Sequence, residues 1–194
     1  MFKFLPALLA LFAIFASPLP ALAADKTWDI DEVMGKADAP ITVIEYASLT
    51  CPHCAHFESE VFPKVKKEWI DTGKVKWVYR DYVWDGLAEA AAMISHCSGD
   101  RYYTFLDTFF HSQQNWEHAN NPLATMKSIA QMGGMSGDKV DACLANKTLL
   151  NDILARKEDA EKLYSIHQTP SFVINGKLVD NVPPDYDAFA KLLK

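Results

Sequence analysis

Two cysteines separated by two residues are the side chains in this sequence best suited to chemistry, in the segment Cys51-Pro52-His53-Cys54. Their spacing allows a small disulfide ring that opens and closes, so the pair can exchange a disulfide with another protein. Each pKa unit by which a thiol is more acidic than the surrounding pH is worth about 1.4 kcal/mol, or roughly 30 mV in a two-electron couple. An acidic Cys51 would therefore destabilise the disulfide and make the pair an oxidant.

Two other kinds of cysteine pair have the same spacing. The pair could be a permanent structural disulfide, or it could supply half of a zinc site. A zinc site needs two more ligands at short spacing, and the sequence contains neither a second CxxC nor an HxxxH pattern. The sequence therefore favours a redox-active pair, and the elements around it decide how acidic the first cysteine is.

These elements predict that Cys51 lies at the start of a helix. Residues 41–47 are an apolar run typical of a strand, and residues 55–61 have helical character. At a helix N-terminus the unpaired backbone N–H groups and the macrodipole stabilise a thiolate over a thiol. His53, if protonated, would add a positive charge beside the sulfur. A second strand-like run, residues 74–82, completes a β-helix-β unit, for which parallel strands are expected.

Two residues near the pair depart from the simple pattern. Glu45 stands among apolar residues of the first strand, so its carboxyl either faces solvent or lies partly buried beneath the cysteines. A buried carboxyl must be paired or protonated, and at this place it could move protons during disulfide exchange. Pro63 cannot donate a helical hydrogen bond, which predicts a kink, or a break with a new start near Lys64.

The N-terminus has the pattern of a secretory signal peptide. Lys3 is followed by an apolar run, residues 4–16, then by a breaker and a small-residue motif at 21–23. The run is short for a membrane span, and an uncleaved anchor is the alternative. Cleavage would leave a chain that begins at Ala24, in a compartment where disulfides persist. Residues 28–30 could then form an edge strand.

The composition excludes one class of partner. The formal net charge is −6, and no extended run of lysine or arginine is present, so a nucleic acid is not an expected partner. No second apolar span, repeat or low-complexity segment follows the N-terminal run. The mature chain of about 170 residues is long enough for one well-buried domain.

A long helical segment separates the strand-forming parts of the chain. Apolar residues recur at helical spacing over residues 85–163, with Ser136 a suitable N-cap for a helix at 137–144. Cys97 and Cys143 both lie in this segment and lack an activating polar setting. In an oxidising compartment a structural disulfide is the favoured interpretation. Two buried free thiols are the alternative.

Strand character returns near the C-terminus. Residues 171–174 are strand-like, and the Asn-Gly pair at 175–176 predicts a two-residue hairpin turn. Thr169 and Pro170 directly precede this hairpin, where a proline cannot donate to the ladder of hydrogen bonds. A short amphipathic helix over residues 186–193 closes the chain.

The order of these features resembles the DsbA family: a strand, Cys-Pro-His-Cys on a helix, a second strand, a helical insertion, Thr-Pro before a hairpin, and a final helix. DsbA proteins are periplasmic thiol:disulfide oxidoreductases of bacteria, and the resemblance covers essentially the whole mature chain. It implies an α/β fold, the thioredoxin fold with an inserted helical domain. The implied divisions are a signal peptide at 1–23, a thioredoxin-like domain in two parts at 24–84 and 165–194, and the helical insertion at 85–164.

The resemblance also implies roles for single residues. Cys51 is similar to the family's nucleophilic cysteine, Cys54 to its buried resolving partner, and His53 to the residue that stabilises the thiolate. Pro170 matches the proline that faces the disulfide and follows a cis peptide bond. Thr169 and Pro170 would hold an extended substrate backbone across the site. Thr169 replaces the valine of the best-known enterobacterial members, at a position that tunes redox potential and partner release.

Further residues follow the family's pattern. Glu45 and Glu58 fall at the spacing of two acids near the family's active site and are candidates for proton transfer. The pair Cys97 and Cys143 resembles the second disulfide of a subgroup described in alphaproteobacteria. The implied partners are reduced, unfolded or folding secreted proteins and a DsbB-type, quinone-linked membrane oxidase. The resemblance implies a periplasmic monomer without a bound cofactor or metal.

Two rival functions remain open. A disulfide isomerase or reductase of the same fold would use the same cysteines, but known isomerases of this superfamily carry an N-terminal oligomerisation segment, for which residues 24–38 are too short. A Cu(I)-binding periplasmic protein would use Cys51, Cys54 and His53 as ligands, since thiolates suit Cu(I). The expected function is donation of the disulfide between Cys51 and Cys54 through a mixed disulfide on Cys51.

Overall fold

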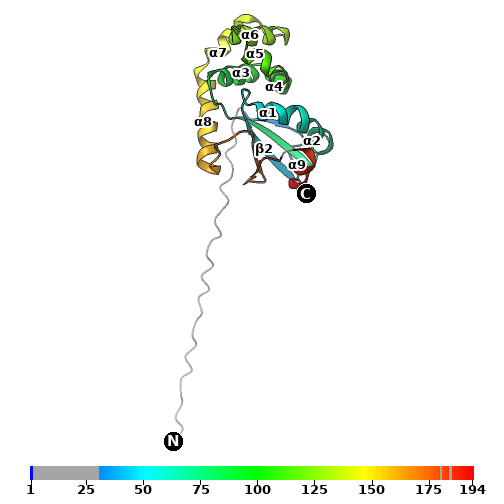
Figure 1. The fold of residues 1–194 in the computed structure, drawn as a ribbon. Coiled ribbons are helices and arrows are strands. Elements are labelled where there is room, and N and C mark those ends of the chain that lie inside the picture. Colours follow the sequence, from blue (N-terminus) through cyan, green and yellow to red (C-terminus); the bar gives the residue numbers. More distant parts are fainter. Residues whose placement is uncertain (2–30, 180, 184) are drawn as a thin grey trace.

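A five-stranded mixed sheet with helices on both faces forms the centre of the computed structural model, which describes residues 1, 31–179, 181–183 and 185–194 (Figure 1). The predicted signal peptide, apart from residue 1, and the possible edge strand at 28–30 lie outside these residues. The strands are β1 (Glu32–Met34), β2 (Ile41–Ala47), β3 (Val75–Asp81), β4 (Ser171–Ile174) and β5 (Lys177–Leu178). None of the described helices has the length and apolarity to cross a bilayer.

The strand order of the sheet is β1-β3-β2-β4-β5. β2 and β3 are parallel, with Glu45 opposite Tyr79, which confirms the β-helix-β prediction. β4 lies antiparallel to β2 on its other side, with Phe172 also opposite Glu45. β2 is therefore paired along both edges. Its residues also pack into clusters on both faces of the sheet, and its last five residues are buried. Such a position explains the nearly continuous apolar sequence of this strand.

The helical stretch that follows β2 is built of α-helical and π-helical parts. These are α1 (Pro52–His56), η1 (Phe57–Val61), α2 (Phe62–Val65) and η2 (Lys66–Ile70), of which η1 and η2 are π-helical. The predicted break near Lys64 is not found, because helical backbone continues through Pro63. The helix is instead irregular just before Pro63, where η1 forms a π-helical turn.

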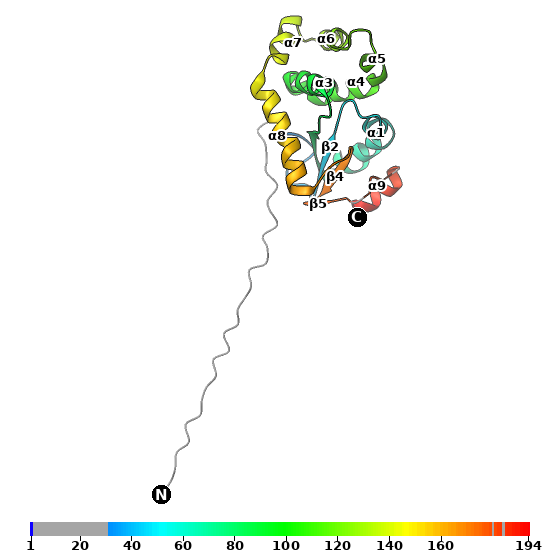
Figure 2. The ribbon, with the colours of Figure 1, turned by 60° about the vertical axis from the view of Figure 1, so that its left-hand side comes forward.

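The segment between β3 and β4 is helical, as its apolar spacing predicts. Its elements are α3 (Gly86–Cys97), η3 (Gly99–Arg101), α4 (Tyr102–His111), α5 (Gln113–Glu117), α6 (Pro122–Met132), α7 (Gly137–Leu144) and α8 (Lys147–Tyr164). α3 to α7 gather beyond one end of the sheet, and α8 runs from this group along the sheet (Figure 1, Figure 2). Ser136 caps α7 as predicted, by accepting a hydrogen bond from the Lys139 N–H.

Helix α8 belongs to both parts of the molecule. Near its start, Ile153 packs in a cluster with residues of α3. Near its end, Ala160 packs against Ile44 and Tyr46 of the sheet. Because one helix contacts the helical group and the sheet alike, the domain division at residue 164 stays a prediction.

The opposite face of the sheet has an aromatic core. It packs against the helical stretch from α1 to η2 and against α9 (Tyr186–Leu192). Phe57, Trp77, Phe172 and Phe189 lie at its centre, with ring centroids 4.7–6.2 Å apart. Aromatic pairs at such distances contribute about 0.5–1.5 kcal/mol each beyond the area that they bury. This core holds the helix that carries the two cysteines against the sheet.

The C-terminal hairpin has the turn that its sequence predicts. Asn175 and Gly176 connect β4 to β5, and both have a positive φ, 48° and 78°. Two central residues with positive φ characterise the type I′ turn that Asn-Gly favours. The Asn175 side chain also accepts a hydrogen bond from the Thr42 N–H at 2.8 Å, which ties the turn to β2.

A disulfide joins Cys97, the last residue of α3, to Cys143 of α7. Their Cα atoms lie 6.1 Å apart, and the two residues are 46 positions apart in the sequence. The pair is therefore the predicted disulfide and not two free thiols. In the chain-entropy model, closing a loop of this length stabilises the fold by about 4 kcal/mol.

Replacing both of these cysteines, in the variant C97A/C143A, is expected to lower the free energy of unfolding by up to about 4 kcal/mol, because the unfolded chain regains the entropy of an open loop. Urea unfolding followed by circular dichroism measures this loss. The wild-type protein, unfolded without reductant, is the control and should expose no thiol from either position. Equal stability of the two proteins would contradict a stabilising role for the bond.

Candidate active site

Cys51 stands at the N-terminus of α1, as predicted. Its amide donates to the Ser48 carbonyl at 3.0 Å, which closes the turn after β2. Its backbone is extended (φ −86°, ψ 118°), and its carbonyl accepts a helical hydrogen bond from the Ala55 amide. The two sulfurs are not bonded to each other in this structure. Cys51 is 9% exposed and Cys54 is fully buried, so the first sulfur is the one that another protein can reach.

The two thiols differ in acidity. The pKa of Cys51 is lowered to about 5, because stabilisation of the thiolate by its neighbours outweighs the effect of burial. The stabilising groups are the Cys54 thiol, the Thr169 side chain and the backbone N–H groups of Cys54 and His53. Burial raises the pKa of Cys54, and the neighbouring Cys51 raises it further. At neutral pH the reduced pair therefore carries a thiolate on Cys51 and a proton on Cys54.

His53 contributes to this acidity through its main chain. Its imidazole is exposed, so the thiolate-stabilising role that the resemblance gives to the ring stays a prediction. Among the described residues, no group of three or more His, Cys, Asp and Glu side chains is arranged to hold a metal ion.

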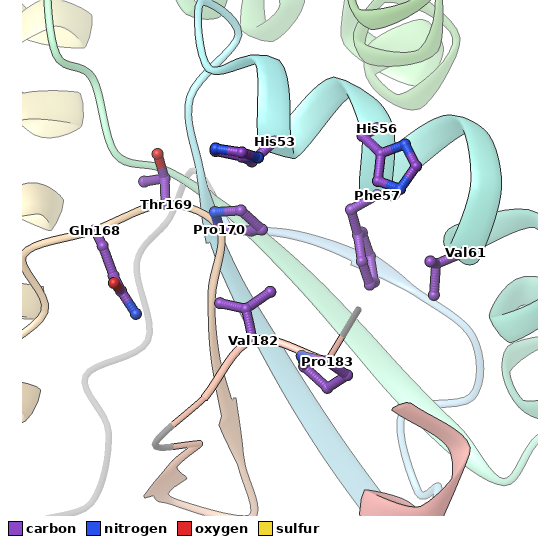
Figure 3. Close-up of a pocket in the computed structure, with 9 residues that line it drawn as sticks. All are labelled: His53, His56, Phe57, Val61, Gln168, Thr169, Pro170, Val182 and Pro183. Atoms are coloured by element: carbon purple, nitrogen blue, oxygen red, sulfur yellow. The ribbon is translucent and has the colours of Figure 1, made fainter. Parts of the chain in front are cut away.

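The peptide bond between Thr169 and Pro170 is cis, as the resemblance implies. These residues precede β4 and lie across from the helix that carries His53 (Figure 3). The Cys51 thiol donates to the Thr169 carbonyl at 3.3 Å. Two segments that are 118 residues apart in the sequence thus meet at one sulfur.

Two residues that belong to no recognisable sequence motif hold the Cys51 turn and the cis-proline segment in place through hydrogen bonds. Trp84 donates its indole N–H to the Thr169 hydroxyl at 2.9 Å. Gln113 of α5 is buried, and its side-chain amide donates to the carbonyls of Leu49 at 2.7 Å and Cys51 at 3.2 Å. Both contacts join segments more than 60 residues apart, so no local spacing in the sequence could have indicated them.

Glu45 is fully buried, so the solvent-facing alternative is wrong. Burial, and then the charge of the neighbouring Glu58, raise the pKa of Glu45 well above its usual value. Neither carboxyl oxygen of Glu45 has a well-formed hydrogen bond among the described residues. Burial also raises the pKa of Glu58 to about 8, and the charge of Asp107 adds to the effect. Both shifts favour the protonated carboxyls, and Glu45 lies close enough to Cys51 for the charge of the sulfur to raise its pKa further.

A cavity of about 300 Å³ lies between the helix of the cysteines and the cis-proline segment (Figure 3). Its lining is mostly apolar, with polar groups at the edge: His53, His56, Phe57, Val61, Gln168, Thr169, Pro170, Val182 and Pro183. An apolar cavity next to a reactive sulfur can hold side chains of a protein whose own core has not yet formed.

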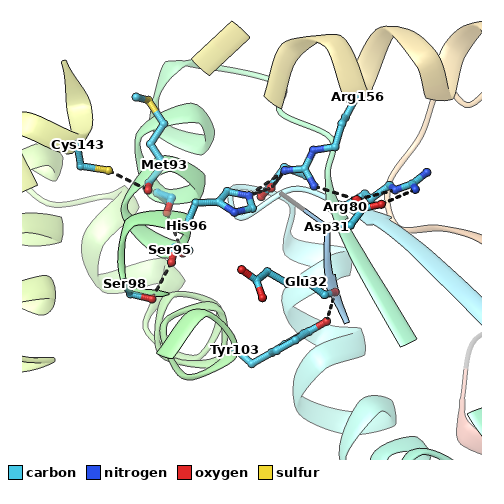
Figure 4. Close-up of polar contacts among 12 residues, drawn as sticks. Asp31, Glu32, Arg80, Met93, Ser95, His96, Ser98, Tyr103, Cys143 and Arg156 are labelled. Carbon is cyan, nitrogen blue, oxygen red and sulfur yellow. Dashed lines mark hydrogen bonds and ion pairs between the residues drawn. The ribbon is translucent and has the colours of Figure 1, made fainter. Parts of the chain in front are cut away.

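A buried ion-pair network fastens the end of β3 to the surrounding helices (Figure 4). Arg156 of α8 donates to Asp81 at 3.0 Å, and Asp81 also bonds to His96 of α3 at 2.8 Å. Arg80 pairs with Asp31 at 2.7 Å. Although burial alone would raise the pKa of Asp81, its contacts with His96 and Arg156 hold it below the usual value. The network thereby fixes the strand end from which the chain continues toward the active site.

Comparisons with known proteins agree on one family. The family model described as Thioredoxin matches residues 29–194. A protein of Rickettsia bellii, named provisionally as a protein-disulfide oxidoreductase, is 32% identical over 160 residues, which cover 80% of this chain and 62% of that protein. The disulfide bond formation protein D of Bacillus subtilis is 26% identical over 171 residues, which cover 84% of this chain and 75% of that protein. The chain thus spans less than two thirds of the length of the rickettsial relative.

One solved structure is similar over nearly the whole chain. Wolbachia pipientis alpha-DsbA1 is 31% identical, with a TM-score of 0.77, and the match covers 91% of this chain and 90% of that chain. Together with the family model, this match confirms the predicted fold class, a thioredoxin fold with an inserted helical segment.

Replacing Glu58 by glutamine is expected to change how the stability of the reduced protein depends on pH. The pKa of Glu58 is about 8 in the folded protein, so as the pH rises the unfolded chain loses this proton first, from about pH 4.3. The contribution of Glu58 to stability is therefore fully present at low pH and is lost as the pH rises to 8. The urea midpoint of E58Q, relative to wild type, should increase across this window.

The exposed Glu60, two residues further along the helix, supplies the matched control variant E60Q. Its midpoint relative to wild type should not change over the same range of pH. A difference between E58Q and wild type that stays constant from pH 5 to pH 8 would show that Glu58 titrates as an ordinary glutamate.

Proposed function

Because the chain belongs to the DsbA family of thioredoxin-fold proteins, we propose that it is a thiol:disulfide oxidoreductase that donates the disulfide between Cys51 and Cys54 to reduced proteins. The observation that carries this proposal is the place of Cys51 at the N-terminus of α1, with its sulfur beside the cis-proline segment, where its pKa is lowered to about 5. A pair whose reduced form is stabilised in this way has a disulfide that is easily transferred. The names of the rickettsial and Bacillus relatives, which refer to disulfide chemistry, support the same activity.

In the proposed reaction a substrate thiolate attacks the sulfur of Cys51, the more exposed of the two. The bond between Cys51 and Cys54 breaks, its electron pair leaves with Cys54, and a mixed disulfide joins Cys51 to the substrate. A second substrate thiolate then attacks the substrate sulfur of this mixed disulfide and releases Cys51 as a thiolate. The products are an oxidised substrate and a reduced pair, and the exchange uses no bound cofactor.

The buried acids are proposed to handle the proton of Cys54. Cys54 leaves in a buried place that disfavours its thiolate, since burial raises its pKa. Burial raises the pKa of Glu45 and of Glu58, which favours the protonated form of both carboxyls. We assign to these two acids the transfer of a proton to Cys54 as it leaves and its removal when the disulfide is reformed.

The cis-proline segment and the cavity are proposed to bind the substrate. Thr169 and Pro170 would hold an extended substrate backbone beside Cys51, in the manner of an added strand. The apolar cavity that these residues share with Phe57 and Val61 would accept side chains next to the substrate cysteine. His53, at the edge of this cavity, is assigned to stabilising the thiolate that the exchange releases.

We place this reaction in the periplasm. Residues 1–23 would serve as a cleaved signal peptide, and the mature protein would act as a monomer on reduced, unfolded or folding secreted proteins. The disulfide between Cys97 and Cys143 supports an oxidising compartment, because such bonds seldom persist in the cytosol. Each cycle leaves a reduced pair, so a DsbB-type, quinone-linked membrane oxidase is proposed to accept its electrons.

The oxidised protein, mixed with a reduced two-cysteine peptide, is expected to convert the peptide to its disulfide while its own pair becomes reduced. Mass spectrometry of alkylated samples measures both changes. The variant C51A should lose this activity completely because it lacks the attacked sulfur. The variant C54A keeps the attacking sulfur of Cys51 but has no second thiol to resolve a mixed disulfide, so it should remain covalently linked to a disulfide-containing peptide.

The rival functions give different results in the same preparation. Rapid recovery of scrambled ribonuclease with slow peptide oxidation would favour an isomerase. One equivalent of copper in protein purified from the periplasm would favour Cu(I) binding. A wild-type protein that leaves the reduced peptide unchanged would contradict the oxidase proposal.

A further inference from the structure

Trp84 is a large aromatic side chain held in an exposed position near Cys51. It follows β3, and its residue is 46% exposed. The Tyr82 ring lies 4.8 Å from its ring, and Lys157 Nζ stands 5.2 Å over the indole. These contacts hold the indole in one place although much of it faces solvent. The contact that explains its orientation is the hydrogen bond of its N–H to Thr169.

The chemistry of this hydrogen bond determines what the Thr169 hydroxyl can do. An indole N–H is only a donor, so the Thr169 oxygen must accept the bond of 2.9 Å from Trp84. The hydroxyl keeps one proton of its own to donate. The Thr169 backbone carbonyl lies 3.3 Å from the Cys51 sulfur, and the side chain of the same residue lies near enough to contribute to the lowered pKa of Cys51. A hydroxyl can lower a thiol pKa in this way when it donates to the thiolate.

Thr169 thus offers Cys51 a different partner in each protonation state. As a thiol, Cys51 donates to the Thr169 backbone carbonyl at 3.3 Å. As a thiolate it has no proton to give and can only accept, which the Thr169 hydroxyl can satisfy. The bond from Trp84 occupies one acceptor site of that hydroxyl and polarises it, which strengthens its donation.

We infer that Trp84 is a positioning residue for the redox site: by donating its indole N–H to Thr169, it directs the threonine hydroxyl proton to the Cys51 sulfur and so stabilises the thiolate. Trp84 itself touches neither sulfur nor substrate in this role. The inference deepens the proposed disulfide exchange, in which Cys51 is the thiolate released last. It gives an aromatic residue outside the cysteine motif a share in setting the redox potential.

Titration of the reduced protein tests this relay, because a thiolate absorbs at 240 nm and a thiol does not. The variant W84F keeps an aromatic ring and loses only the N–H, and its Cys51 midpoint should rise by about half a pH unit. In the T169V background the same replacement should produce no shift, since the hydroxyl that receives the bond is gone. The variant T169S keeps a hydroxyl and should respond to W84F as the wild-type protein does.

Trp69 provides a matched control, since its indole N–H also donates to a hydroxyl, that of Tyr186 at 3.2 Å. The variant W69F should leave the Cys51 midpoint unchanged. Other ionisable groups whose charges interact with Cys51, namely Cys54, Glu45 and Glu117, are the same in every variant. The equilibrium with glutathione should follow the titration, with W84F less oxidising than the wild type.

Two results would overturn the inference: a Cys51 midpoint in W84F equal to that of the wild type, or a shift of equal size in the T169V background. The second would show that Trp84 acts on the sulfur by a route other than Thr169. Because the titration uses reduced protein alone, it remains decisive even for a protein that oxidises no peptide. Failure of the oxidase proposal and failure of the relay are therefore separate outcomes.

Discussion

The hydrogen bonds that reach the Cys51 sulfur are the interaction on which the rest of the structure depends. A helix leaves its first N–H groups unpaired, and a sulfur placed there as a thiolate accepts from them. The neighbouring Cys54 thiol and the Thr169 side chain add to this stabilisation, and together they outweigh the cost of partial burial. Disulfide transfer follows from the same cause, because whatever stabilises the reduced pair makes its oxidised form easier to give away.

The fold can be understood as the frame that brings these donors together. Strand β2 ends four residues before Cys51, so the turn and the helix that follow present the sulfur at the end of the sheet. β4 pairs with β2 and thereby carries the cis-proline segment to the same place. The helical segment between β3 and β4 contributes Gln113, whose side-chain amide donates hydrogen bonds to the carbonyls of Leu49 and Cys51 in the turn after β2. Each of these contacts joins distant parts of the chain, so the site exists only in the folded protein.

Local features of the site could be predicted from the sequence. The strand before the cysteines, the helix that begins at Cys51 and the Asn-Gly turn at 175–176 are all set by neighbouring residues, through apolar spacing and turn chemistry. The cis bond before Pro170 was accessible only through resemblance to a family, because most such bonds are trans. Pro63 shows where prediction from neighbouring residues fails. A helix break was expected there, but the helical backbone continues through Pro63 and a π-helical turn precedes it.

Tertiary features of the site could not be predicted in this way. Whether Glu45 faces solvent depends on what covers β2, and in a central strand both faces are covered, so alternation along the strand carries no information. Trp84 and Gln113 act through side-chain hydrogen bonds to segments far away in the sequence, and no local spacing in the sequence indicates such contacts. The roles of such residues can be recognised only from the hydrogen bonds that their side chains make in the folded protein.

The preference of the Cys51 sulfur for the thiolate form can be measured by the absorbance of the reduced wild-type protein at 240 nm as the pH is varied. One transition is expected, with a midpoint near pH 5, and the variant C51A should lack it. A midpoint near that of an unperturbed cysteine, about 8.5, would contradict this preference.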